Sequence, residues 1–138
     1  MTRLIKATVT GGALLAAAAL LAAGPAQAAS GATGSGDYLY LTVTKGESRS
    51  GGTHGTLLLC DPPQGHSRAA EACAELDTVG GDIARIAPAK DAMCPMVYAP
   101  VTAQARGVWN GRPIEYRETF ANSCAMAVRT GAVFALDS

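Results

Sequence analysis

The chain has 138 residues with 11 basic and 11 acidic side chains, so its formal net charge is zero when the histidines are neutral. This balance gives no reason to expect nucleic acid or a membrane as a partner, because nucleic acids and anionic lipid surfaces recruit basic proteins. The length supports one small domain with a single core, which is marginally stable unless cross-links reinforce it.

The amino-terminal residues are typical of a secretory signal peptide. Arg3 and Lys6 precede an unbroken run of Ala and Leu at residues 13–23, and the small-residue site Ala-Gln-Ala follows at residues 26–28. A membrane anchor is the alternative, but an anchor needs about 20 apolar residues and does not normally end in such a site. We therefore expect residues 1–28 to be removed, which leaves a secreted, extracellular protein of 110 residues (138 minus 28).

The mature chain begins with a Gly-rich segment, residues 29–37, which lacks core-forming side chains and is expected to be flexible. The folded domain is expected to span residues 38–138. Alternating apolar and polar residues at 38–44 predict a half-buried strand. Its inward face would carry Leu39, Leu41 and Val43. Residues 45–55 indicate a loop, and residues 56–60 predict a second strand.

A helix is predicted after residues 61–65, whose prolines and glycine cannot continue a strand. Ser67 is a candidate N-cap for a helix over residues 68–79, and two glycines follow it as a stop signal. One helical face would carry Cys73 toward the sheet. Residues 82–86 have room for one further turn.

The carboxyl-terminal half predicts three more strands. Residues 101–106 alternate in polarity, and the Asn-Gly pair at residues 110–111 favours a type I′ hairpin leading into a strand at residues 113–120. Residues 121–124 indicate a turn, and residues 132–136 predict a last short strand. The patterns together predict an α+β domain, in which an antiparallel sheet of about five strands packs against one main helix.

All four cysteines follow the signal peptide, and in an oxidising compartment an even number predicts two disulfides. They are Cys60, Cys73, Cys94 and Cys124, which allow three pairings. No CxxC pair occurs, and the two histidines, His54 and His66, are not at ligand spacing. We therefore expect no metal site.

No arrangement of residues indicates catalysis. An enzyme needs a nucleophile with a base, a pair of carboxylates in a pocket, or a metal. His54 and His66 lie in predicted loops, where isolated histidines are usually solvated. Trp109, beside the hairpin turn, is expected to cover the core or to contact another subunit. We expect a protein that is not an enzyme and that binds no cofactor.

Residues 93–100, Met-Cys-Pro-Met-Val-Tyr-Ala-Pro, predict an extended, anchored loop. Pro95 and Pro100 restrict the backbone, and Pro95 has no amide hydrogen to donate within a central strand. A disulfide at Cys94 would anchor the loop, whose apolar side chains would remain exposed. An extended backbone with exposed side chains is the form in which a protease binds a substrate. The alternative is that these apolar residues form the edge of a core strand.

Several segments resemble the Streptomyces subtilisin inhibitor family. They are Met93-Cys94-Pro95-Met96-Val97-Tyr98, Gly107-Val108-Trp109-Asn110-Gly111, Phe120-Ala121-Asn122-Ser123-Cys124 and Val133-Phe134-Ala135. Upstream, Cys60-Asp61-Pro62 and Ala72-Cys73-Ala74-Glu75-Leu76 are similar to the family too. The resemblance spans essentially the whole mature chain, and its most specific part is the Cys-Pro-Met-Val-Tyr core with a cysteine 30 residues after the first.

The resemblance implies an inhibitor of subtilisin-like or chymotrypsin-like serine proteases, whose reactive bond is Met96-Val97 and whose loop is supported by Asn122. The rest of the protease-binding loop would be Met93, Cys94, Pro95, Tyr98, Ala99 and Pro100. The implied disulfides are Cys60–Cys73 and Cys94–Cys124. The implied fold is a five-stranded antiparallel sheet with one main and one short helix, and the implied assembly is a homodimer through the sheet face away from the loop.

The chain departs from the family pattern at Ala99, where an acidic residue often follows the tyrosine, and this change would alter affinity for particular proteases. The loop between Cys60 and Cys73 is also shorter, which would affect only a distal surface.

The alternative function is a secreted non-catalytic binding module that uses the loop at residues 93–100 to hold an extracellular protein or polymer. Such a module would neither compete with protease substrates nor be cleaved at Met96-Val97.

Overall fold

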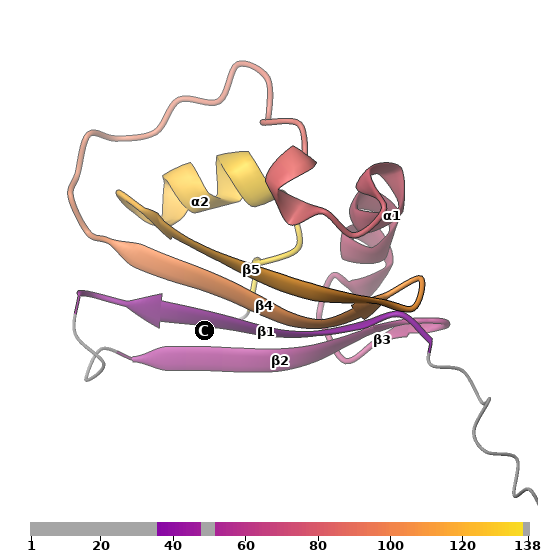
Figure 1. Ribbon diagram of the computed structural model, residues 1–138. Helices are drawn as coiled ribbons and strands as arrows, with labels where there is room; N and C mark the ends of the chain where they lie inside the picture. Colours follow the sequence, from indigo (N-terminus) through magenta and orange to yellow (C-terminus); the bar gives the residue numbers. More distant parts are fainter. Residues whose placement is uncertain (1–35, 48–51, 137–138) are drawn as a thin grey trace, which may run out of the picture.

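The computed structural model describes residues 36–47 and 52–136. Its five strands form one antiparallel sheet in the order β3-β2-β1-β4-β5, and the described helices lie on one face of that sheet (Figure 1). The strands are β1 (Tyr38–Lys45), β2 (Thr53–Cys60), β3 (Pro63–Gln64), β4 (Val101–Trp109) and β5 (Arg112–Phe120). The helices are α1 (Ala69–Val79), the single 3₁₀ turn η1 (Ile83–Arg85) and α2 (Ser123–Thr130). The predicted α+β class is confirmed.

The core lies between the sheet and the helices. On β1, the predicted inward side chains Leu39 and Leu41 are fully buried and Val43 nearly so. Each such side chain contributes about 1.5–3 kcal/mol by leaving water. In β4, Ala103 and Ala105 lie opposite Val43 and Leu41 and are also fully buried. Their small size lets α2 pack closely over β4 and β5.

The hairpin between β4 and β5 has the predicted turn. Asn110 and Gly111 both have positive φ angles, 49° and 74°, as a type I′ turn requires. Asn110 N–H donates to Asp37 Oδ1 at 2.6 Å, and the Asp37 carbonyl accepts from Cys60 N–H at 2.9 Å. Asp37, the last residue of the expected flexible segment, is thereby bound to the sheet. Residues 1–35, which include the predicted signal peptide, lie outside the described residues.

His66, rather than Ser67, organises the start of α1. The helix begins at Ala69 and has no side-chain cap from its N-cap residue, so the predicted Ser67 cap is wrong. The imidazole Nδ1 of His66 accepts from Arg68 N–H at 2.8 Å, so the proton resides on Nε2, which donates to the Val133 carbonyl at 3.2 Å. His66 is therefore buried and bonded to backbone on both sides, contrary to the expected solvated histidine.

The predicted last strand at residues 132–136 is wrong, as is the simple turn at residues 121–124. The chain enters α2 at Ser123, and after it the backbone folds into successive turns that bury Val133 and Phe134. The fifth strand is instead β3, which pairs with the end of β2. Two residues suffice there because β3 only covers the edge of a sheet that is otherwise complete.

Strand β2 begins three residues before the predicted start at residue 56, because its first residues pair with the end of β1. The end of α1 agrees with the prediction, since Gly80 adopts the left-handed conformation at the C-cap. Trp109 is 1% exposed and covers the core as expected. Within the described part of the chain, no helix has the length and apolarity needed to cross a membrane.

We predict that replacing Gly81 with alanine lowers the stability of the fold. It has φ +81°, and an added Cβ would overlap the ring of Trp109, whereas Gly46 has φ +89° with no atom within 4 Å of such a Cβ. Both Gly→Ala changes strain the backbone, but only Gly81→Ala also overpacks the core. We expect Gly81→Ala to lower the free energy of unfolding by about 1–3 kcal/mol more than Gly46→Ala. Urea unfolding of both variants measures the difference, and equal losses would show that Trp109 moves aside at no cost.

Candidate functional site

The loop between η1 and β4 leaves four large apolar side chains in solvent. It runs from the end of η1 past α2 to the start of β4 without regular secondary structure (Figure 1). The exposed fractions are 94% for Met93, 104% for Met96, 57% for Val97 and 72% for Tyr98. These residues are not part of a core strand, so the alternative reading of the sequence does not hold. These four side chains are therefore accessible to a binding pocket on a partner protein.

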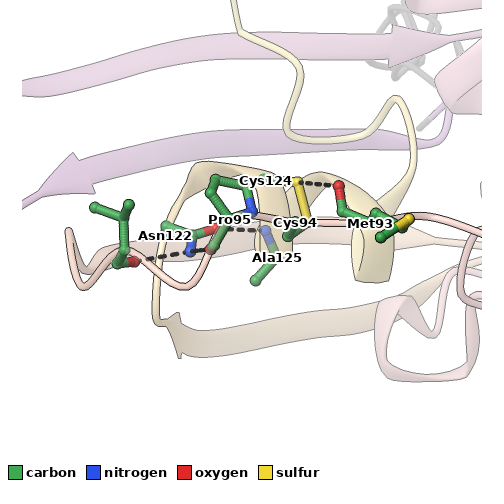
Figure 2. Close-up of a disulfide and its surroundings, with 7 residues drawn as sticks. Met93, Cys94, Pro95, Asn122, Cys124 and Ala125 are labelled. Atoms are coloured by element: carbon green, nitrogen blue, oxygen red, sulfur yellow. Dashed lines mark hydrogen bonds between the residues drawn. A yellow bond between two sulfur atoms is a disulfide. The ribbon is translucent and has the colours of Figure 1, made fainter.

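Asn122 holds the backbone on both sides of Met96. Its amide Nδ2 donates to the Pro95 carbonyl at 3.1 Å and to the Val97 carbonyl at 2.9 Å. Its Oδ1 accepts from Ala125 N–H at 2.9 Å, which caps the amino terminus of α2 (Figure 2). Asn122 itself is buried. The two carbonyls that flank Met96 are therefore turned inward, while the Met96 side chain points into solvent.

A disulfide ties the amino-terminal side of the loop to the same helix. Cys94 bonds to Cys124 in the first turn of α2, with the two Cα atoms 5.6 Å apart, and the Met93 carbonyl oxygen lies 3.9 Å from the Cys124 sulfur (Figure 2). The other disulfide, Cys60–Cys73, joins the end of β2 to α1. The structure therefore contains the pairing that the resemblance implied.

Backbone hydrogen bonds hold the loop at three further points. Ala99 N–H donates to the Ala121 carbonyl at 2.8 Å, just before Asn122. The Pro100 carbonyl accepts from Gly46 N–H at 2.8 Å, and Ala89 N–H donates to the Val128 carbonyl of α2 at 2.9 Å. The segment is thus fixed on both sides of residues 96 and 97, and binding a partner would cost it little conformational entropy.

Glu47 is a contact that the sequence did not predict. The hydroxyl of Tyr98 donates to Glu47 Oε1 at 2.5 Å, which links the loop to the residues that follow β1. The hydrogen bond and the negative charge of Glu47 raise the pKa of Tyr98, because both favour the neutral phenol. The two residues are 51 positions apart. Tyr98 belongs to the Cys-Pro-Met-Val-Tyr segment, but Glu47 lies in no recognisable motif, so no sequence signal relates the two.

The sequence did carry a signal for α2. Asn122 is a favourable N-cap, the following residues are mostly small or good helix formers, and Gly131 ends the helix. An Asn-Ser pair also suits a turn, so this pattern is ambiguous in the sequence. Helix α2 matters for the site because its N-cap, Asn122, and Cys124 in its first turn both hold the loop.

Neither a metal site nor a general base built on His66 is found among the described residues. Within them, no group of three or more His, Cys, Asp or Glu residues lies close enough to hold a metal ion. Both nitrogens of His66 are engaged by backbone groups, so this ring has no free nitrogen to act as a general base. The other histidine, His54, lies within β2. The loop is therefore the best-defined candidate site.

Comparison with known proteins gives consistent matches. The family model described as subtilisin inhibitor-like matches residues 35–122. A Streptomyces avermitilis protein, provisionally named a serine protease inhibitor, is 59% identical over 126 residues, which cover 91% of this chain and 84% of the relative. The subtilisin inhibitor of Streptomyces albogriseolus is 42% identical over 125 residues, which cover 88% and 85% of the two chains.

A solved structure matches as well. Sermetstatin from Streptomyces caespitosus, crystallised in complex with Bacillus licheniformis subtilisin, has a TM-score of 0.61 and 31% sequence identity, covering 72% of this chain and 98% of that chain. The family match spans more than half of the sequence, and the sequence matches cover 84% and 85% of the two relatives. The chain therefore belongs to the subtilisin inhibitor-like family.

Proposed function

We propose that the protein is an inhibitor of subtilisin-like serine proteases and that its loop binds the protease active site as a substrate does, with Met96-Val97 as the reactive bond. The observation that carries this proposal is the fully exposed Met96 side chain between two carbonyls that Asn122 holds inward. Support also comes from the family and from the relative crystallised with subtilisin. The protein acts on proteases without being an enzyme itself.

Docking requires an extended backbone and one side chain for the main specificity pocket of the protease. Residues 93 and 94 are unpaired in the described sheet, so their backbone groups can form strand-like hydrogen bonds with a protease, whereas Pro95 has no amide hydrogen and its carbonyl is held by Asn122. Met96 is unbranched and flexible, and it adapts to a deep apolar pocket. Val97, Tyr98, Ala99 and Pro100 would contact the enzyme beyond the reactive bond. Ala99 brings no charge to this contact, which favours proteases that lack a basic group there.

Slow hydrolysis follows from how the loop is held. The protease serine would attack the Met96 carbonyl carbon, form an acyl bond to it and release the amine of Val97. That amine cannot diffuse away, because the Val97 carbonyl is bonded to Asn122 and Ala99 is bonded to Ala121. A tethered amine has a high effective concentration, so it attacks the acyl-enzyme again and restores the peptide bond. The disulfide holds the acyl side against the same helix.

We further propose that residues 1–28 are a signal peptide and that residues 38–138 are the inhibitory domain. Both disulfides fit an oxidising extracellular compartment, which supports secretion. Amino-terminal sequencing of the protein recovered from culture medium tests the cleavage site. A mature chain that retains residues 1–28 would contradict the proposal.

The open face of the sheet is proposed to form a homodimer. Tyr38, Tyr40 and Leu57 remain 38%, 54% and 45% exposed on this face, opposite the helices and the loop (Figure 1). Tyr40 lies directly opposite Leu57 and Arg106 in the sheet.

A substitution at Tyr40 tests the dimer. Tyr40→Lys would place a second cation beside Arg106 and should convert a dimer into monomers in sedimentation equilibrium. Inhibition per chain should persist, since the loop lies elsewhere. A wild-type protein that sediments as a monomer would contradict this assembly.

Titration of subtilisin with the purified protein tests the function directly. We expect stoichiometric loss of protease activity, followed on long incubation by slow, partial cleavage only at Met96-Val97, which mass spectrometry detects. Rapid digestion at many sites would contradict a held loop. Undiminished activity toward several serine proteases, with no cleavage at residue 96, would favour the non-catalytic binding module instead.

Substitutions at Asn122 separate its two roles. Asn122→Asp retains an oxygen that caps α2 but loses both donors to the loop, whereas Asn122→Ala loses the cap as well. Each lost hydrogen bond contributes about 0.5–1.5 kcal/mol to holding the loop. We expect both variants to be hydrolysed at Met96-Val97 at least about tenfold faster than the wild type. Only Asn122→Ala should also lose the roughly 1 kcal/mol of cap stability.

Mass spectrometry of timed digests measures the hydrolysis rates, and urea unfolding measures stability. An Asn122→Asp variant that is cleaved as slowly as the wild type would show that the two amide hydrogen bonds do not protect the reactive bond. Faster cleavage of Asn122→Asp with a smaller loss of stability than in Asn122→Ala is the combination that assigns the amide nitrogen to the loop.

A further inference from the structure

The methionines of this chain are divided between fully exposed and buried positions. Met93 and Met96 are 94% and 104% exposed in the loop, whereas Met126 in α2 is 6% exposed. The remaining methionine, Met1, lies outside the described residues. Since oxidation of a thioether follows its access to the oxidant, Met93 and Met96 should react long before Met126.

We propose that Met96 is an oxidation site through which peroxide turns off protease inhibition. This inference rests on the proposed function, in which Met96 enters the specificity pocket of the protease. The sulfur of Met96 needs no conformational change to meet a peroxide, because the same exposure that presents the side chain to a protease presents it to small oxidants. Met126 provides an internal control of the same chemistry within the same fold.

The oxidation step balances with hydrogen peroxide as the oxidant. A lone pair of the Met96 sulfur attacks one peroxide oxygen, the S–O bond forms, and the O–O bond breaks. A proton transfers to the departing hydroxide, which leaves as water. The sulfur loses two electrons and the peroxide gains them. Methionine sulfoxide reductases reverse the change at the expense of thiols, so the modification is not a terminal lesion.

The sulfoxide should fit the protease poorly. It places a strongly polar S–O group where the apolar thioether entered an apolar pocket, and a polar group buried without a partner weakens binding. The loop cannot offer another side chain in its place, because Asn122 and the disulfide fix the backbone on both sides of residue 96. Met93, three residues before the reactive bond, also oxidises but does not enter the main pocket.

The test treats the purified secreted protein with hydrogen peroxide and removes the residual oxidant with catalase before subtilisin is added. Peptide mapping by mass spectrometry identifies the sulfoxide at each methionine. The inhibition constant is then compared before and after treatment for the wild type, Met96→Leu and Met93→Leu, each against its own untreated form. Thermal unfolding of the treated protein checks that the fold is intact.

We expect the inhibition constant of the wild type to rise roughly 10- to 100-fold, a range set by the cost of burying an unpaired polar group. The Met93→Leu protein should show most of this rise, Met96→Leu should show little of it, and a methionine sulfoxide reductase should reverse it. An unchanged constant despite complete oxidation of Met96 would overturn the inference, as would an equal rise in Met96→Leu or a rise that appears only when Met126 is oxidised. Untreated protein that does not inhibit subtilisin would overturn the proposed function itself.

Discussion

One side chain, Asn122, connects the exposed loop to the folded domain. Its amide nitrogen binds two carbonyls of the loop, and its oxygen caps α2, so a single planar group fixes the loop and the helix relative to each other. Both donors and the acceptor of the amide are in use, and the group is buried. An amide offers two N–H donors and a separate acceptor oxygen, and Asn is the shortest side chain that carries one, which explains why Asn suits this position.

The rest of the molecule keeps that connection rigid. Helix α2 has only eight residues, a length at which an isolated helix is marginal in water. It is ordered because Met126 packs into the core and because the turns after it bury Val133 and Phe134. His66 and Glu75 hold this carboxyl-terminal segment from the α1 side, through the Val133 carbonyl and the Ala132 amide respectively. The stability of the sheet and helices is thereby transmitted to the loop.

The parts of the fold that were predicted correctly are those whose signals are local. The alternation in β1, the Asn-Gly turn and the glycine stop of α1 each depend on a few neighbouring residues, and each agrees with the structure. The start of α1 does not follow from local sequence. Arg68 N–H donates to the ring of His66, and that ring is held in place by its second hydrogen bond, to the carbonyl of Val133, a residue distant in sequence. The segment at residues 132–136 is apolar because its turns carry side chains into the core. Periodicity alone does not distinguish such buried turns from a short buried strand.

The position of the candidate loop could be predicted from the sequence, but the contacts that hold it could not. Its prolines, cysteine and apolar residues are contiguous, so the sequence alone indicated an anchored loop. The contacts that hold it come from α2, from Ala121 and from the residues after β1, and the Tyr98–Glu47 bond spans 51 positions. Long-range contacts of this kind follow from the tertiary fold and leave no local pattern.

The structure separates the residues that we propose to contact a protease from those that maintain the fold. Met93, Met96, Val97 and Tyr98 expose most of their surface, so they contribute little to the core. Their side chains can therefore change without large cost to folding, whereas Asn122 and the disulfide must stay to keep any such loop in place. Under the proposed mode of binding, substitutions at residues 96–99 would change the target protease while the fold is kept. The same separation leaves the thioether of Met96 unprotected by the fold, so recognition and chemical vulnerability have a common structural cause.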